Sequence, residues 1–430
     1  MPGFSFSPVV RGKGYTGSGI KVGVLSDSVD HLIEVQQSGD LPAVTVLQDA
    51  SGNTGEGTAM LEIVYDLAPG ASLYFATAYN SPANFANNII SLKNAGCKVI
   101  VDDVGYFNES PFQDDVISQA VSTVTAAGVS YFSSAVNEGN KNAGTAGTWE
   151  GDFVDGAAGP YGGREHAFAT GVVANQIMAN PYVISLFWSD PLLSSSNDYD
   201  LYVVDGLGTI LAASENYQNG TQDPYESIDV GSIDLNYTGQ FIIINKYSGS
   251  DRFLHLSAYR GRTQYATHGD ARGHPTVESA FCVSAVSAAS KTTPFTGDES
   301  LETFTSDGPR RIFYNPDGTA ITPGNLSSSG GKVRVKPDIT AADGVACATP
   351  GFNPFYGTSA AAPHAGAVAA LLLSANKNAT VAKIRSVLTR SALPAPSAWN
   401  EDAGYGIIMA DRSLNLLPSA MAGIYLNLLQ

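Results

Sequence analysis

One serine stands where a run of small residues opens a long apolar segment. Residues 355–366 read FYGTSAAAPHAG, and VAALLL follows soon after, so the pattern predicts that Ser359 begins a buried helix. The positive end of a helix macrodipole stabilises a nearby negative charge, and small neighbours let a substrate backbone approach. A serine placed in this way can act as a nucleophile if a base takes its proton. The alternative is a serine that only caps the helix.

Four other polar residues offer groups that such a serine would need. Glu56 is the first residue of EGTAMLEIVYDLA, a predicted helix, whereas Asp27, Asp103 and Asn137 stand at or just beyond the ends of apolar strands. A carboxylate can accept the proton of a serine, although an unperturbed pKa of about 4.3 suits acid better than neutral pH. A side-chain amide can donate to a developing oxyanion, which typically contributes about 3 kcal/mol.

The elements that position these groups alternate between strands and helices. Short apolar runs predict strands at 20–25, 72–78, 97–105 and 129–136, and amphipathic stretches predict helices at 56–68, 82–96 and 112–128. This alternation predicts an α/β fold with a parallel sheet covered by helices on both faces. Ligands of such sheets bind at the carboxyl ends of the strands, which is where the polar groups are expected to meet.

The pattern changes in the middle of the chain. Segments such as YVISLFWSD, YDLYVVD and QFIIINKY are short β runs separated by Gly, Asn, Asp and Ser, with no convincing helix. We therefore expect an inserted antiparallel β-sandwich, jelly-roll-like, at 163–262. The α/β domain would consist of a first part at 1–162 and a second part at 263–430.

Composition narrows the range of partners. The 430 residues carry 40 acidic and 23 basic side chains, for a net charge of -17. Nucleic acids and anionic membranes need basic patches, so neither is an expected partner, and no apolar run of membrane-spanning length is evident. The N-terminus lacks the pattern of a signal peptide, which leaves a cytoplasmic protein or a trimmed mature form, and the acidic balance favours a secreted one.

The three cysteines lie in apolar contexts without metal-binding spacing. Their odd number excludes a complete disulfide framework, so Cys97, Cys282 and Cys347 are expected to be buried free thiols.

Several segments, in order along the chain, resemble the motifs of the subtilisin-like serine proteases, the subtilases. They are GYTGSGIKVGVLSDS, EGTAMLEIVYDLAPGA, KVIVDDVGY, YFSSAVNEGN, ETFTSDGP, VKPDITAADG and GTSAAAPHAGAVAAL. The resemblance covers everything except the β-rich insert. It implies that Ser359 is the nucleophile, that Asn137 donates to the oxyanion, and that the strand carrying Val104 and Gly105 pairs with a peptide substrate.

The chain departs from the family pattern at the base. Glu56 stands where a subtilase has its catalytic histidine, and Ser26 stands where the catalytic aspartate belongs, with Asp27 one residue later. The sedolisins, serine-carboxyl peptidases of the same fold, are similar here because they use Ser, Glu and Asp. Their aspartate would fall at Met60, however, and they replace the oxyanion asparagine that this chain keeps.

A second carboxyl near Glu56 would share a proton with it and separate the two pKa values. Asp103 aligns beside the triad and is the favoured partner, with Asp102 pointing to the opposite face of the strand. Asp27 is the other candidate, although side chains alternate along a strand and Asp27 would face away unless the strand ends or bulges there.

The sequence thus predicts a serine endopeptidase with a Glu/Asp carboxyl dyad, acting through an acyl-enzyme and favouring acidic pH. The alternative is an inactive pseudoprotease that binds peptides or proteins. No cofactor is required. Pro69 follows Glu56 by only 13 positions, which is too few for the usual subtilase calcium loop. Asn197, Asp198 and Asp200 could ligate calcium or simply form a polar turn. The expected partner is a peptide or protein substrate.

Overall fold

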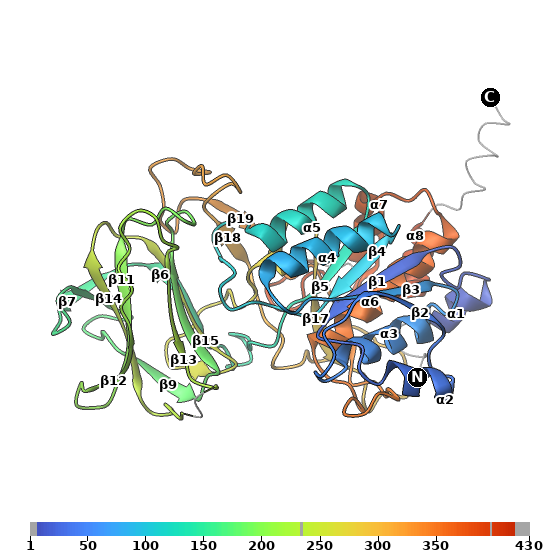
Figure 1. Ribbon diagram of the computed structural model, residues 1–430, viewed down its shortest axis with the longest axis horizontal. Coiled ribbons are helices and arrows are strands. Elements are labelled where there is room, and N and C mark those ends of the chain that lie inside the picture. The colour runs from blue at the N-terminus through green and yellow to red at the C-terminus, as the bar shows by residue number, and fades with distance from the viewer. Residues whose placement is uncertain (1–6, 233–234, 396–397, 418–430) are drawn as a thin grey trace.

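A computed structural model describes residues 7–232, 235–395 and 398–417. The chain forms an α/β region and an antiparallel region, which lie side by side along the long axis of the molecule (Figure 1). The outermost residues of the predicted first and last domain parts, 1–6 and 418–430, lie outside the described residues.

The α/β region is built on a parallel sheet, as the alternation of strands and helices predicts. Within the described residues it has seven strands in the spatial order β2 (Val44–Gln48), β3 (Ser72–Thr77), β1 (Lys21–Ser26), β4 (Val99–Asp102), β5 (Ser130–Ser134), β17 (Phe281–Ser287) and β20 (Ile339–Asp343). Every neighbouring pair is parallel. Strands β1, β4 and β5 are therefore adjacent, and their carboxyl ends meet at one edge.

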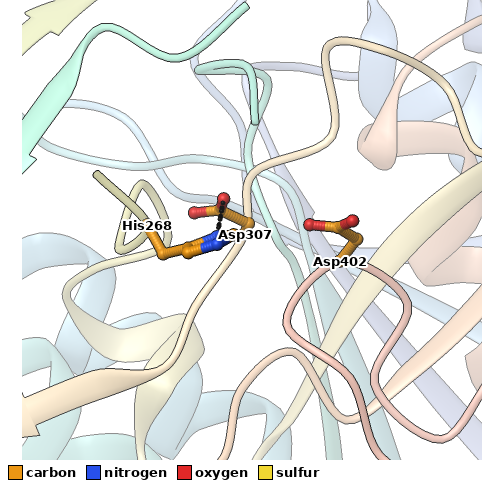
Figure 2. Close-up of side chains that lie close together, drawn as sticks. All are labelled: His268, Asp307 and Asp402. Atoms are coloured by element: carbon orange, nitrogen blue, oxygen red, sulfur yellow. Dashed lines mark hydrogen bonds and ion pairs between the residues drawn. The ribbon is translucent and has the colours of Figure 1, made fainter. Parts of the chain in front are cut away.

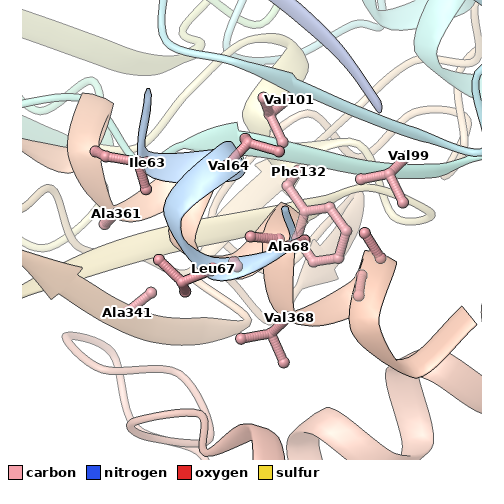
Figure 3. Close-up of a cluster of buried hydrophobic side chains, with 14 of the residues drawn as sticks. Ile63, Val64, Leu67, Ala68, Val99, Val101, Phe132, Ala341, Ala361 and Val368 are labelled. Carbon is pink, nitrogen blue, oxygen red and sulfur yellow. The ribbon is translucent and has the colours of Figure 1, made fainter. Parts of the chain in front are cut away.

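Helices cover both faces of this sheet. They are α1 (Ser7–Gly12), α2 (Leu32–Ser38), α3 (Glu56–Leu67), α4 (Pro82–Asn94), α5 (Val116–Ala126), the short 3-10 helix η1 (His274–Thr276), α6 (Thr358–Ala375), α7 (Val381–Ser391) and α8 (Ala410–Leu416). Alternate residues of β4 face opposite layers: Val99 and Val101 pack with α3 and α6, while Ile100 packs with α4 and α5. Figure 3 shows part of the first cluster, with Val64 of α3 beside Val101.

Helix α5 begins later than the sequence predicts. Residue 112 was the expected start, but the carboxylate of Asp115 accepts hydrogen bonds from the backbone N–H groups of Ile117 and Ser118, at 3.0 and 3.2 Å. This N-cap fixes the start of the helix at Val116.

The antiparallel region consists of two sheets that pack face to face on a shared core. One contains β13 (Tyr225–Asp229), β10 (Val183–Trp188), β15 (Phe253–Tyr259) and β6 (Thr148–Asp152); the other contains β12 (Ile210–Ser214), β11 (Asp198–Val204), β14 (Phe241–Ser248), β8 (Arg164–His166), β7 (Asp155–Ala158), β9 (Asn175–Ala179) and β16 (Arg262–Thr263). Trp188 and Leu254 of the first sheet meet Tyr199 and Ile244 of the second.

The antiparallel region starts earlier than the expected boundary at 163. Strand β6 pairs with β15, so the region begins at Thr148. A later segment, which contains β18 (Arg310–Ile312) and β19 (Lys332–Arg334), also packs on the antiparallel region. Its Phe313 lies in one hydrophobic cluster with Phe187 and Phe253 of that region.

Helix α6 passes through the core of the α/β region. Among the described helices it is the one that is long and apolar enough to cross a membrane, a feature that the sequence analysis missed. However, 89% of this helix is buried inside the protein. Its composition is thus explained by its place between α3 and the sheet. The prediction of buried free thiols is confirmed for Cys97, Cys282 and Cys347.

Candidate active site

A cleft of about 570 Å³ opens at the carboxyl edge of the parallel sheet. All seven residues singled out in the sequence line it: Asp27, Glu56, Asp103, Val104, Gly105, Asn137 and Ser359. They arrive from the ends of β1, β4 and β5 and from the first turns of α3 and α6, which is why residues more than 300 positions apart meet in one place. Their proximity is observed, whereas their roles remain predictions.

Ser359 lies in the first turn of α6 and is 8% exposed. The preceding cap, Gly357, has φ 115°, a conformation that glycine adopts readily and other residues rarely do. A Cβ atom at Gly357 would lie 3.4 Å from the Nδ2 atom of Asn137, so a larger side chain there would border that donor. The first N–H groups of a helix lack partners within it, so the Ser359 N–H is available beside its own hydroxyl.

Glu56 is the first residue of α3 and faces Ser359 across the cleft. Burial raises the pKa of Glu56 above its usual value. A hydrogen bond with the Ser359 hydroxyl opposes this shift, and the negative charge of Asp27 adds to it. Glu56 therefore holds its proton more tightly than a solvated glutamate does, while remaining in contact with the hydroxyl that it would deprotonate.

Asp103 lies on the same side of the cleft, directly after β4. Burial raises its pKa well above the usual value, and the charges of Glu56 and Asp27 raise it further. Its Oδ1 atom is buried and accepts no hydrogen bond from any described residue. The charge of Glu56 thus makes ionisation of Asp103 costly, because two neighbouring carboxyl groups cannot both ionise cheaply.

Asp27 is 2% exposed, and its carboxylate is hydrogen-bonded to the turn that precedes α3. Strand β1 ends at Ser26, so the alternation of side chains does not turn Asp27 away from the cleft. Its carboxylate accepts hydrogen bonds from Thr54 N (2.8 Å), Thr54 Oγ1 (2.6 Å), Gly57 N (3.3 Å) and Ser28 N. Asp27 thereby fastens the turn that begins α3 and orients Glu56 through the backbone.

Asn137 follows β5 with its amide held in one orientation. Its Oδ1 atom accepts hydrogen bonds from Thr358 N (3.1 Å) and Thr358 Oγ1 (2.9 Å). The oxygen is therefore turned toward the start of α6, and the Nδ2 donor is left for the cleft. The preceding Val136 has φ 63°, a strained conformation for a β-branched residue and one that is found where a site requires it.

Asp102 points to the opposite face of β4, as expected. It is fully buried, and its Oδ1 atom contacts His274 Nε2 (3.0 Å) and accepts a hydrogen bond from Ser133 Oγ (2.7 Å). The Nδ1 atom of His274 lies 2.7 Å from Glu109 Oε2. Asp102 is therefore part of a buried cluster and not a solvated residue at the end of a strand.

Sequence reasoning missed most of the aromatic and basic wall of the cleft. The remaining lining residues include Tyr79, Tyr106, Phe107, Tyr182, Tyr259, Arg260 and Tyr356. Tyr182, Tyr259 and Arg260 belong to the antiparallel region, for which no motif indicated proximity to Ser359.

Among the described residues, His268, Asp307 and Asp402 form the one set whose ligand atoms lie close enough to hold a metal ion, within 4.8 Å of one another. Figure 2 shows the His268 ring against the Asp307 carboxylate, with Asp402 facing them. Asp307 already accepts hydrogen bonds from Gly269 N (2.8 Å) and Lys141 N (2.9 Å) and contacts His268 Nδ1 (2.7 Å). Because the Asp307 carboxylate already has these hydrogen-bond partners, the cluster fits a contact that holds loops together better than a metal site.

The calcium alternative at Asn197, Asp198 and Asp200 is also not assembled. Asn197 Nδ2 donates to the carboxylate of Asp190, at 2.7 and 2.8 Å, and Asp200 accepts from Asn245 Nδ2 at 2.9 Å. At the usual calcium-loop position, α3 ends at Leu67 and leads within a few residues to β3.

The parallel sheet with helices on both faces, and a serine at the start of a core helix, define a subtilisin-like protease fold. The chain belongs to the subtilase family, which it matches over residues 49–406. No curated protein sequence matches it.

Solved structures similar to the chain are proteases with low sequence identity. The self-cleaved protease domain of PatA is 14% identical, with a TM-score of 0.46, covering 94% of this chain and 98% of that one. The prenylagaramide maturation protease PagA is 13% identical, with a TM-score of 0.49, covering 97% and 100%. Fervidolysin from Fervidobacterium pennivorans is 15% identical, with a TM-score of 0.41, covering 94% and 44%.

Proposed function

We propose that this subtilase is a serine endopeptidase in which a carboxyl pair, Glu56 and Asp103, replaces the histidine base. The observation that carries the proposal is that Glu56, Asp103 and Ser359 line one cleft, where the Ser359 hydroxyl and the Asp103 carboxyl both influence the pKa of Glu56. An ionisable group thus occupies the place of the base, and a second carboxyl is present to tune it.

The reaction follows the two steps of a serine protease. Glu56 accepts the proton of Ser359 Oγ as the oxygen attacks the peptide carbonyl, and it then gives that proton to the leaving amine, which yields an acyl-enzyme. Water, deprotonated by Glu56, attacks the ester and releases Ser359. Asn137 Nδ2 and the Ser359 N–H are positioned to bind the oxyanion of each tetrahedral intermediate.

The substrate would lie along the segment that continues β4. Gly105 is exposed and Val104 half-buried at the rim of the cleft, beyond the last pairing of β4 with its neighbours. An extended peptide can add a strand to such a free backbone.

With a carboxyl pair as the base, we expect cleavage to be fastest at acidic pH. The pair loses its two protons in separate steps, and between them one carboxylate is free to act as base while the other group donates a hydrogen bond to it. We expect cleavage to rise with pH through the first step and to fall through the second, because two adjacent buried charges would then oppose each other. The net charge of -17 supports the further proposal that the protein works outside the cell.

The test is cleavage of unfolded casein between about pH 3 and pH 8 by the wild type, Ser359→Ala and Glu56→Gln. Acid-favoured cleavage that both substitutions abolish would support the proposal. Glu62→Gln is a matched control, because Glu62 lies on the same helix with a pKa that burial also raises, yet it accepts from Thr349 N (2.9 Å) outside the cleft. A folded wild type that cleaves nothing would favour the binding pseudoprotease instead.

A further inference from the structure

The antiparallel region supplies one wall of the cleft. Tyr182 lies just before β10 and Tyr259 ends β15, and the Tyr182 N–H donates to the Tyr259 carbonyl at 2.8 Å. Phe107, from the α/β region, packs against both rings, with centroids at 5.9 Å from Tyr182 and 4.6 Å from Tyr259. The two regions are thus joined by an aromatic contact at the edge of the proposed substrate path.

Arg260 stands on this wall as the one basic side chain among the described lining residues. The cleft otherwise carries the acidic groups Asp27, Glu56 and Asp103. The guanidinium lies over the Tyr259 ring, with its carbon 5.7 Å from the centroid, and it forms no ion pair with any described residue. Its charge is felt at the carboxyl pair, where it lowers the pKa of Glu56 against the effect of burial.

A tight, strained turn presents Arg260. Its φ is 56°, a conformation that costs a non-glycine residue roughly 1 kcal/mol or more. The turn is closed by a hydrogen bond from Gly261 N to Ala258 O at 2.8 Å, and it is tied to the α/β region by Arg260 N donating to Glu138 Oε2 at 3.2 Å. Glu138 directly follows Asn137, so this hydrogen bond fixes the position of the Arg260 backbone relative to the proposed oxyanion donor.

We propose that Arg260 forms a subsite for a carboxylate of the substrate, so that the enzyme prefers peptides with an acidic group beside the bond that is cut. The planar guanidinium fork matches a carboxylate in two parallel hydrogen bonds, and the rings of Tyr182 and Tyr259 can cover the aliphatic part of the side chain. The carboxylate comes from an aspartate or glutamate side chain or from the C-terminus of a short peptide. This inference rests on the proposed peptidase function.

The test uses peptides that differ in one carboxylate. One pair has Glu or Gln at each position flanking the cleaved bond, and a second pair has a free or an amidated C-terminus. For the wild type we expect kcat/KM about tenfold higher for the charged member of one pair at a pH where that group is ionised. In Arg260→Gln that ratio falls to about one, whereas in Arg262→Gln it stays at the wild-type value, because Arg262 is exposed and does not line the cleft.

The pair that shows the ratio identifies the source of the carboxylate. Ratios near one for both pairs in the wild type, or a ratio that Arg260→Gln leaves unchanged, would overturn the subsite.

The same peptides are also titrated onto the Ser359→Ala protein, with and without Arg260→Gln, to obtain dissociation constants. Preferential binding of the charged peptide that requires Arg260, without cleavage by the wild type, would retain the subsite and reject the peptidase. Cleavage without the Arg260-dependent preference would do the reverse.

Discussion

Strand β4 ends in two adjacent carboxylates that face opposite sides of the sheet. On one side, Asp102 lies in a closed cluster where His274 contacts it at 3.0 Å and contacts Glu109 at 2.7 Å. On the other side, Asp103 meets Glu56 at the cleft, with Asp27 close by and no cation among the described residues in direct contact. The first cluster is buried and contains a cation, whereas Glu56 and Asp103 are half-buried and have none beside them among the described residues.

The protonation of the two clusters follows from this difference. Although burial alone would lower the pKa of His274, the carboxylates of Glu109 and Asp102 raise it well above its usual value, so the imidazolium balances them. At the cleft, burial and neighbouring negative charge raise the pKa values of Glu56 and Asp103, which favours their protonated forms. An acid pair without a cation is costly for stability and, under the proposed function, suited to proton transfer, whereas an acid pair around a charged histidine is suited to holding a fold together.

The largest expected effect is on catalysis at the cleft. Glu56→Gln removes the proposed base, so kcat/KM should fall by about 10⁴-fold. Because the substitution also removes one of two repelling carboxyl groups, the melting temperature should stay the same or rise. Casein cleavage and thermal unfolding of the same preparation measure both. A variant that keeps most of its activity, or that unfolds at a markedly lower temperature, would remove the distinction between the two sides of β4.

The next largest effect is on stability at the closed cluster. His274→Ala leaves Asp102 and Glu109 buried without their cation, which should cost about 3–5 kcal/mol of unfolding free energy. Denaturant titration measures the loss, and His274→Gln provides a second variant that fills more of the space. His31→Ala, at an exposed site beside Glu34, is the control and should cost almost nothing. A loss for His274→Ala no larger than that of the control would contradict the assignment.

A smaller effect separates the two aspartates at the cleft. Asp103→Asn should change the pH profile of cleavage, because Glu56 then titrates without a partner carboxyl. Asp27→Asn removes one negative charge that raises the pKa of Glu56, so it should move the optimum, but less than Asp103→Asn does. It should also reduce stability by about 1–3 kcal/mol, since an amide cannot accept all the hydrogen bonds from Thr54 and Gly57. If the optimum moves in Asp27→Asn and not in Asp103→Asn, Asp27 is the partner of Glu56.

The sequence predicts one side of β4 far better than the other. Asp27, Asp103 and Asn137 could be placed at a common edge because short apolar runs fix where parallel strands end. Glu56 could be placed because it stands at the start of a predicted helix where the similar subtilase motif has its histidine. By contrast, the contact of Asp102 with His274 spans 172 positions, and no local pattern reports a pairing of that kind.

The antiparallel region is the second part of the molecule that the sequence predicts poorly. Strand β6 reads TWEGD, which lacks the alternation of apolar and polar residues that marks a half-buried strand, so the start of the region at Thr148 was missed. Arg260 lies in a turn between β15 and β16, and its place at the cleft depends on how the antiparallel sheets pack against the α/β region. Packing between regions leaves no periodic signal in the chain.

The smallest expected effect is on the pH dependence of stability, because the two clusters lose their contributions to the free energy of unfolding over different pH ranges. The pKa of Glu56 is raised on folding, so its contribution to stability is fully present below the unfolded value of about 4.3 and is lost as pH rises through the folded value. The pKa of His274 is also raised, so its contribution persists up to about pH 6.5 and is lost only as pH rises through a higher folded value.

The melting temperature of Glu56→Gln relative to wild type should therefore increase as pH rises from about 4 toward 7, a range in which the His274 cluster contributes a constant amount until its upper end. Thermal unfolding at several pH values measures the difference, with Glu34→Gln as the exposed control. A difference that stays flat across this range would mean that Glu56 ionises as freely in the folded protein as in the unfolded chain, and this result would contradict the shared proton that we propose for the cleft.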